Sequence, residues 1–177
     1  IIFYKKLIIW VAMMPSNKIL FVEDEFALLK GISASLGVYS DITGVMSLEE
    51  ARKALSNETF DLVLLDKGLP DGSGLDLLPR IRESSPDTAV IILTGDSDFN
   101  SVNKCIAAGA DDYLVKSEFI MQDLLVRIPL ALKKAKLRKE IEEARQHLSL
   151  TLPTSVEQLN GNAYEQFLGN IIRITPS

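Results

Sequence analysis

Carboxylates follow two apolar segments of this sequence, at the point where each segment ends. Glu23 and Asp24 come directly after the run 18–22, and Asp66 closes the run 60–66. Short runs that are apolar throughout are typical of buried parallel strands. If the two strands are neighbours, the three carboxylates converge at the carboxyl edge of the sheet, where open parallel sheets bind their ligands.

Converging carboxylates of this kind predict a magnesium site. Anions held close together repel one another unless a divalent ion binds them or their pKa values rise. Mg²⁺ prefers a few carboxylates together with water. Thr94 ends another apolar run and Lys116 follows the last one, so a hydroxyl and an ammonium join the same edge. Such a set can transfer a phosphoryl group to Asp66, because the cations neutralise the arriving charge.

The elements that position these residues alternate between strand and helix. Strands are predicted at residues 18–22, 41–45, 60–66, 88–95 and 111–117. Ser47 and Glu50 have the spacing of a capping box and mark the start of a helix. Residues 71–72 predict a turn, and the acidic pair 111–112 a solvated loop. The alternation predicts an α/β fold with a parallel sheet and helices on both faces, since each right-handed crossover covers one side.

The C-terminal part of the sequence departs from this alternation. Helical character continues from about residue 118 to about residue 148 despite Pro129, which removes one backbone donor. Apolar residues then recur at spacings of four and three, which is typical of a coiled-coil seam, although a solvated helix packed on its own domain also fits so short a pattern. The seam positions are Leu137, Ile141, Ala144 and Leu148.

Four parts of the chain follow from these patterns. We expect a domain at residues 16–136, a helical connector or coiled-coil seam at 137–150, and an unassigned tail at 151–177 that could begin a further domain. Residues 1–15 form an apolar leader that is too short to span a bilayer and lacks the cleavage site of a signal peptide. The chain does not begin with Met, and Met14 is followed by PSNKILFVEDE, so we expect the native start at Met13 or Met14.

Composition narrows the function classes. The 177 residues are enough for one domain with its own core and few for two. A formal charge of −5 gives no electrostatic reason for direct binding to nucleic acid, and no segment suggests a membrane partner. The single cysteine, Cys105, cannot form an internal disulfide, which fits a reducing compartment. We therefore expect a cytoplasmic protein.

Four segments of the sequence resemble the signature segments of response-regulator receiver domains in two-component signalling, the CheY-like superfamily. The segments read ILFVEDE, LVLLDKGLPDGSGLDLL, VIILTG and GADDYLVK, and the resemblance covers residues 17–136. It implies a flavodoxin-like (βα)5 fold, a doubly wound sheet of five parallel strands in the order 2-1-3-4-5. The extended C-terminal helix would follow this domain.

The resemblance implies a role for residues at the carboxyl edge of the predicted sheet. Asp66 would be the phosphoacceptor, served by a histidine kinase or a phosphotransfer protein. Thr94 and Lys116 would bind the phosphoryl oxygens, and Tyr113 would be the aromatic switch that turns inward when Thr94 moves. The protein would then be a switch with self-catalysed phosphoryl transfer and dephosphorylation, rather than a turnover enzyme.

The resemblance also implies a cofactor and a route for the signal. Mg²⁺ would be held by Asp24, Asp66 and the backbone carbonyl of Gly68, and by Glu23 through water. Phosphorylation would reshape the surface of the fourth helix, fifth strand and fifth helix. The long last helix would carry the change to a partner, to a second copy of the chain, or to an output domain outside this sequence. No segment of this sequence resembles a DNA-binding domain.

Two features depart from the family pattern. Ser117 follows Lys116 where proline is usual, and Lys67 adds a cation beside Asp66. The departure after Lys116 keeps open an alternative, a receiver-like interaction module that is never phosphorylated. A phosphatase with an aspartate nucleophile is a second alternative, but its usual motif has another Asp two residues after the nucleophile, where this sequence has Gly68.

Overall fold

The computed structural model describes residues 17–95 and 99–151. The leader expected at residues 1–15, and residues 152–177 of the expected tail, lie outside this part of the chain. The chain divides into two units after Lys139, and each is described by itself. No helix within the described residues has the length and apolar character needed to cross a membrane.

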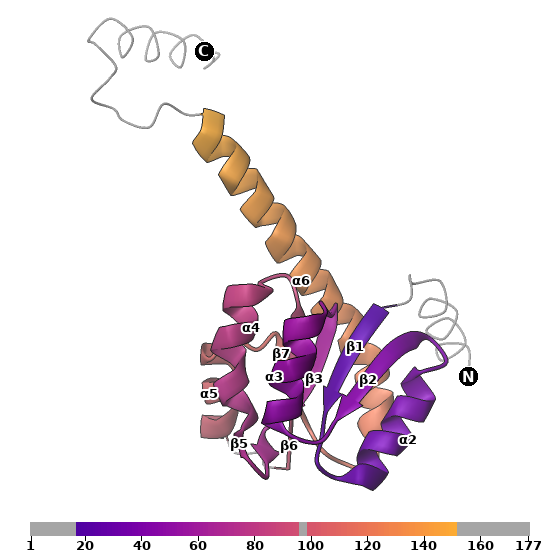
Figure 1. The fold of residues 1–177 in the computed structure, drawn as a ribbon. Coiled ribbons are helices and arrows are strands. Elements are labelled where there is room, and N and C mark those ends of the chain that lie inside the picture. The colour runs from indigo at the N-terminus through magenta and orange to yellow at the C-terminus, as the bar shows by residue number, and fades with distance from the viewer. Residues whose placement is uncertain (1–16, 96–98, 152–177) are drawn as a thin grey trace, which may run out of the picture. The chain divides into compact units, whose positions relative to one another are not determined.

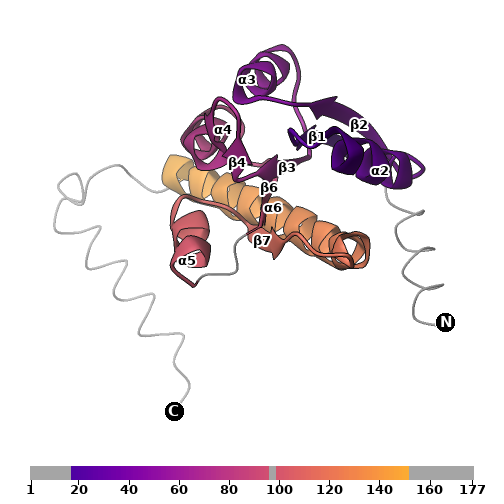
Figure 2. The same ribbon diagram turned by 90° about the horizontal axis from the view of Figure 1, so that it is seen from below.

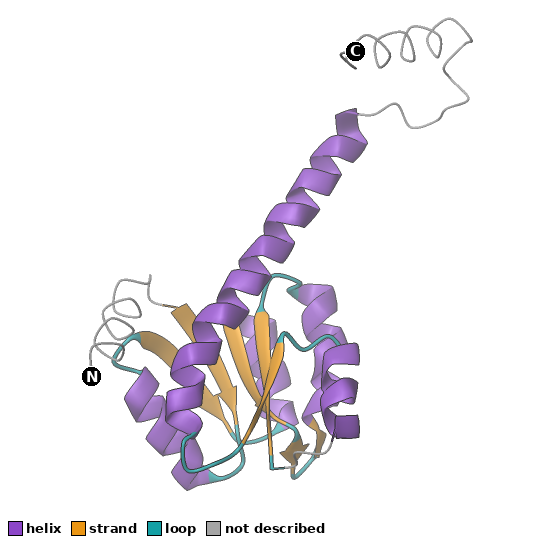
Figure 3. Ribbon diagram, turned by 180° about the vertical axis from the view of Figure 1, so that it is seen from behind, coloured by secondary structure: helices purple, strands orange, loops and turns teal. Residues whose placement is uncertain are grey.

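A five-stranded parallel sheet forms the centre of the first unit (Figures 1 and 3). Its strands are β1 (Asn17–Val22), β2 (Ser40–Val45), β3 (Leu62–Asp66), β6 (Ala89–Thr94) and β7 (Asp112–Val115). Their spatial order is β2-β1-β3-β6-β7, and every neighbouring pair is parallel. Counted among these five strands, the order is 2-1-3-4-5, so the predicted flavodoxin-like fold is confirmed.

Helices cover both faces of the sheet (Figure 2). One face carries α2 (Phe26–Leu36) and the first part of α6 (Ile120–Thr151), and the other carries α3 (Leu48–Asn57), α4 (Leu78–Ser84) and α5 (Phe99–Ala107). Strand β1 shows why its sequence is apolar throughout. Ile19 and Phe21 enter the core on the first face, and Leu20 and Val22 enter the core on the second.

The start of α3 confirms the predicted cap with one difference. Ser47 Oγ accepts the backbone N–H of Glu50 at 3.2 Å. The carboxylate of Glu50 accepts the backbone N–H of Met46 at 2.7 Å, one residue before the partner that a capping box uses. Both bonds still satisfy donors at the helix entrance.

A short antiparallel ribbon links the sheet to α4. Strands β4 (Gly68–Leu69) and β5 (Gly72–Ser73) pair with each other, and the 3-10 helix η1 (Gly74–Leu77) follows. Pro79 lies in the first turn of α4, where its missing N–H costs nothing. The ribbon therefore begins two residues after Asp66, at the edge predicted to carry the chemistry.

Helix α6 has 32 residues and continues through Pro129. Its inward side chains in the first unit are buried in the core; they are Ile120, Leu124, Ile128, Ala131 and Ala135. Leu130 and Leu137 on the same helix are exposed. In the second unit, the side chains of residues 140–147 are exposed, and Ile141 keeps 53% of its surface accessible.

Candidate functional site

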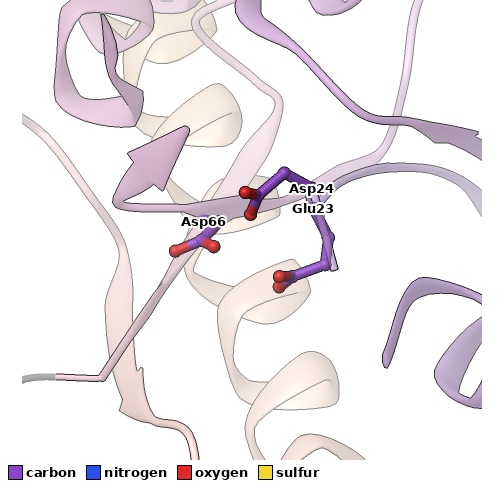
Figure 4. Close-up of side chains that lie close together, drawn as sticks. All are labelled: Glu23, Asp24 and Asp66. Carbon is purple, nitrogen blue, oxygen red and sulfur yellow. The ribbon is translucent and has the colours of Figure 1, made fainter. Parts of the chain in front are cut away.

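Three carboxylates meet at the carboxyl edge of the sheet (Figure 4). Glu23 and Asp24 follow β1, and Asp66 ends β3, which lies beside β1 with Val22 opposite Leu65. One ligand oxygen from each carboxylate lies within 4.8 Å of the others. The structure thus brings together the three acidic residues that the sequence analysis selected.

The three carboxylates differ in their surroundings. Glu23 is fully buried and Asp66 is 5% exposed, whereas Asp24 is exposed to solvent. Burial raises the pKa of Glu23; Lys116 opposes this effect and the charge of Asp66 adds to it. Oε2 of Glu23 has no hydrogen-bond partner within the part of the chain that the structure describes. A buried oxygen without a partner is costly, so it marks a place for a further donor or cation.

Lys116 joins two of the carboxylates. Its Nζ donates to Oδ2 of Asp66 at 2.6 Å and to Oε1 of Glu23 at 2.7 Å. Burial alone lowers the pKa of Lys116, but the hydrogen bonds to Asp66 and then to Glu23 outweigh it, so the pKa is raised. The ammonium therefore stays charged at neutral pH and offsets part of the negative charge.

The serine that follows Lys116 leaves the ammonium in place. Every peptide bond within the described residues is trans, so the Lys116–Ser117 bond is trans too. The backbone N–H of Lys116 donates to the carbonyl of Thr94 at 2.7 Å. Oγ of Ser117 accepts the N–H of Phe119 at 3.2 Å, just before α6 begins. Ser117 thus helps to form the turn into that helix.

The remaining expected site residues lie at or near the same edge. Thr94 ends β6 and is buried, opposite Val115 of β7. Gly68 is exposed, and its N–H donates to Oδ1 of Asp66 at 3.1 Å. Tyr113 lies on β7, half-buried against the core that α3, α4 and α5 cover.

The donor set fits a magnesium ion. Three carboxylates lie together at this edge, and Lys116 forms ion pairs with two of them, Glu23 and Asp66. Oε2 of Glu23, which has no hydrogen-bond partner among the described residues, and the exposed carboxylate of Asp24 offer oxygens to an ion that keeps several waters. Oxygen ligands with retained water are the coordination that Mg²⁺ prefers.

The prediction of a solvated loop at residues 111–112 was wrong. Asp112 begins β7 and forms an ion pair with Arg127, and Asp111 lies just before this strand. The side chain of Asp111 is buried and accepts hydrogen bonds from Arg82, from Arg138 and from the backbone N–H of Val90. Lys134 also donates to its backbone carbonyl. Its arginine partners lie 29 and 27 residues away in sequence, so no local spacing could have predicted them.

Comparison with known proteins decides the family. Residues 19–128 match the family model described as the response regulator receiver domain. The chain belongs to this family. Receiver domains of response regulators are modules of two-component systems, as the resemblance implied.

Several response regulators are similar to this receiver. It is 38% identical over 104 residues to response regulator protein PilR of Pseudomonas aeruginosa, covering 58% of this chain and 23% of PilR. It is 41% identical over 123 residues to response regulator ArlR of Staphylococcus saprophyticus, covering 67% of this chain and 53% of ArlR. The chain spans about half the length, or less, of these relatives.

Solved structures agree with this assignment. The BeF3-activated DrrB receiver domain is 37% identical with a TM-score of 0.62, covering 67% of this chain and 99% of that one. NtrX from Brucella abortus is 25% identical with a TM-score of 0.70, covering 92% of this chain and 36% of NtrX.

Proposed function

We propose that this receiver is a Mg²⁺-dependent switch in which Asp66 accepts a phosphoryl group from a histidine kinase or a phosphotransfer protein. The observation that carries the proposal is the position of the Lys116 ammonium, which is bonded to both Asp66 and buried Glu23. A nucleophilic carboxylate at an open edge, with a cation beside it and acidic ligands next to it, suits phosphoryl transfer.

In the proposed reaction, a carboxylate oxygen of Asp66 forms a bond to phosphorus. The bond from phosphorus to the imidazole nitrogen of the donor breaks, and its electron pair stays on the imidazole. Lys116 and the hydroxyl of Thr94 bind the phosphoryl oxygens and stabilise their charge. Hydrolysis of the aspartyl phosphate later returns Asp66 and releases phosphate, so the protein acts as a self-resetting switch rather than a turnover enzyme.

The residues that would hold the metal are Asp24, Asp66, Glu23 through water, and the backbone carbonyl of Gly68. When bound, Mg²⁺ would neutralise charge that Lys116 alone leaves uncompensated. Oε2 of Glu23 supports this assignment, because it has no hydrogen-bond partner among the described residues and could accept one from a water of the ion.

The signal would leave the domain through α5, β7 and α6. Binding of the phosphoryl group by Thr94 would let Tyr113 turn inward from its half-buried position, and the shared surface of these elements would change. Residues 137–150 would then act as a connector to a partner or to an output domain. A cytoplasmic location and the absence of direct contact with nucleic acid or membrane belong to the same proposal.

A homodimer through α6 is part of this proposal. Leu137 and Ile141 are 55% and 53% exposed, and both belong to the predicted seam. Two apolar side chains left accessible at heptad spacing gain by packing against the same seam of a second copy.

One alternative is an interaction module that is never phosphorylated. Its basis was Ser117, which stands where the family usually has proline. Lys116 reaches both carboxylates with this serine in place, so the departure gives that alternative little support.

Intact mass spectrometry tests the proposal directly. The wild type, incubated with Mg²⁺ and acetyl phosphate, is expected to gain one phosphoryl group, and Asp66→Asn or removal of Mg²⁺ with a chelator is expected to abolish the gain. An adduct that persists in Asp66→Asn contradicts the assignment of the acceptor. Steady turnover of a phosphomonoester would instead favour a phosphatase.

A further inference from the structure

One side chain joins the ribbon after Asp66 to the start of α3. Oδ1 of Asp71 accepts the backbone N–H of Leu48 at 2.9 Å, and Oδ2 accepts that of Glu49 at 3.0 Å. The first N–H groups of a helix have no partner inside it, and the residue at its own N-cap usually provides one. Here Ser47 accepts the N–H of Glu50. Asp71, more than twenty residues away in sequence, accepts the N–H groups of Leu48 and Glu49.

The bonds to α3 favour the ionised carboxylate. The N–H of Leu48 is the largest cause that holds the pKa of Asp71 below its usual range, and the N–H of Glu49 adds to it. Asp71 is therefore ionised at neutral pH. A bidentate, charged acceptor at a helix N-terminus fixes the relative position of the two segments that it joins.

The ribbon that Asp71 holds is short and closed. Gly68 pairs with Ser73 across it, and the N–H of Gly74 donates to the carbonyl of Lys67 at 2.9 Å at its base. At the tip, Gly72 has a φ of 147°, and a Cβ there would lie 3.0 Å from Cδ1 of Leu48. The tip therefore packs directly on α3, beside the bonds that Asp71 makes.

Gly68 lies on the first strand of this ribbon, and its N–H donates to Oδ1 of Asp66 at 3.1 Å. It is exposed, and a Cβ placed on it would meet no atom of the described residues within 4 Å. The direction of its carbonyl depends on the hydrogen bonds of the ribbon and on whatever holds the ribbon in place. Asp71, at the other end of the ribbon, fixes the ribbon to α3 through its hydrogen bonds to Leu48 and Glu49.

We propose that Asp71 is a positioning residue for the metal, which fixes the ribbon on α3 and so aims the Gly68 carbonyl at the ion. This inference rests on the proposed function, because Gly68 is a ligand only if that proposal holds. Groups that orient metal ligands typically change metal affinity by about 10- to 100-fold when they are removed.

Titration calorimetry with Mg²⁺ alone, on the full metal-free chain, tests the inference. Asp71→Ala is expected to weaken Mg²⁺ binding about 10-fold. Ser47→Ala removes the bond that α3 makes to its own cap and leaves the ribbon untouched, so its Kd is expected to stay within about twofold of wild type. Asp76→Asn removes a nearby exposed carboxylate and controls for the loss of charge. Equal Kd values for Asp71→Ala and wild type, or equal losses in the controls, overturn the inference.

Two further measurements separate positioning from folding. Without metal, the amides of Gly68 and Gly72 should exchange hydrogen faster in Asp71→Ala than in Ser47→Ala. With acetyl phosphate, saturating Mg²⁺ should restore the adduct rate of Asp71→Ala, because only the affinity is lost. If Asp71→Ala does not fold, Asp71→Asn, which keeps one acceptor, should show an intermediate Kd, and a Kd equal to wild type overturns the inference.

The outcome for wild type distinguishes the two proposals. A wild type that binds Mg²⁺ but forms no adduct contradicts phosphorylation by acetyl phosphate at Asp66, while the Kd comparison still decides the role of Asp71. A wild type that binds no Mg²⁺ overturns both.

Discussion

Nζ of Lys116 lies 2.6 Å from Oδ2 of Asp66, although 50 residues separate them in the sequence. The same nitrogen also bonds Glu23, which is fully buried. A single ammonium thus compensates two carboxylates that would otherwise repel each other. Its removal should affect both the chemistry and the charge balance of the edge.

Lys116→Ala is expected to slow formation of the phosphoryl adduct by roughly 10²- to 10³-fold, the usual cost of removing one preorganised donor. The rate is measured by intact mass at saturating Mg²⁺. Lys53→Ala removes an exposed lysine of α3 and should keep the wild-type rate. An unchanged rate in a folded Lys116→Ala would contradict the role given to the ammonium.

The raised pKa of Glu23 predicts how stability depends on pH without metal. Folded Glu23 keeps its proton in the range between the ordinary glutamate pKa and its own raised value, where the unfolded chain has released it. The contribution of Glu23 to the free energy of unfolding therefore falls as pH rises through this range. Glu23→Gln lacks this contribution, so its stability relative to wild type should increase with pH through this range.

Urea unfolding of the metal-free proteins between pH 4 and pH 8 measures that difference. Glu25→Gln, at an exposed position two residues away, is the control for the loss of one carboxylate. A stability difference between Glu23→Gln and wild type that does not vary with pH would show that burial does not dominate at Glu23.

Gly74 is required by a close backbone approach. A Cβ at this position would overlap the backbone carbonyl oxygen of Asp66, whereas a Cβ on Gly68 would meet nothing within 4 Å. Gly74→Ala should lower the free energy of unfolding by about 3 kcal/mol, and Gly68→Ala should change it by less than about 0.5 kcal/mol. Chemical denaturation of the two variants compares them, and similar losses would contradict the clash.

The ion pair between Arg138 and Asp111 should stabilise the first unit. Arg138 also donates to the carbonyls of Pro86 and Thr88. Arg138→Ala should lower the free energy of unfolding by about 2 kcal/mol, because hydrogen bonds to a buried charged group are among the strong ones. Arg145→Ala removes an exposed arginine whose carboxylate partner lies 3.9 Å away, and it should stay within about 0.5 kcal/mol of wild type.

The proposed seam on α6 predicts a concentration-dependent dimer. Ile141→Asp places a charge within the seam and should shift the protein to monomer in sedimentation velocity experiments. Gln146→Asp places the same charge five residues later, on the other side of the helix, and should leave the dimer intact. A wild type that sediments as a monomer at all concentrations would contradict the proposed dimer.

Much of the candidate site could be predicted, because its acidic residues lie at the ends of strands. Glu23, Asp24 and Asp66 follow buried apolar runs, and parallel strands place such residues at one edge regardless of detail. The strand order itself came from the resemblance to the family. The position of Lys116 relative to its two partners needed the structure, since a lysine side chain can reach in many directions.

The contacts that sequence analysis missed join segments through side chains. Asp71 fits a turn, and nothing in its neighbourhood indicates that it caps a helix more than twenty residues earlier. The close approach between the backbone of Asp66 and Gly74 is likewise not visible in the sequence, because it depends on how the ribbon folds back on β3. Local patterns report the preferences of a segment for a conformation, and they contain no information on which distant segment will lie against it.

The ion pair between Asp111 and Arg138 has a consequence for where this receiver can be truncated or fused to another domain. The family match ends at residue 128, but a fragment ended there would lack Arg138 and Lys134 and would uncover the core beneath Ala131. Fusions should therefore keep the chain to at least Lys139. Beyond that point each residue of α6 adds about 100° of rotation and 1.5 Å of rise, so the number of residues kept sets the angular phase at which an attached module leaves the helix.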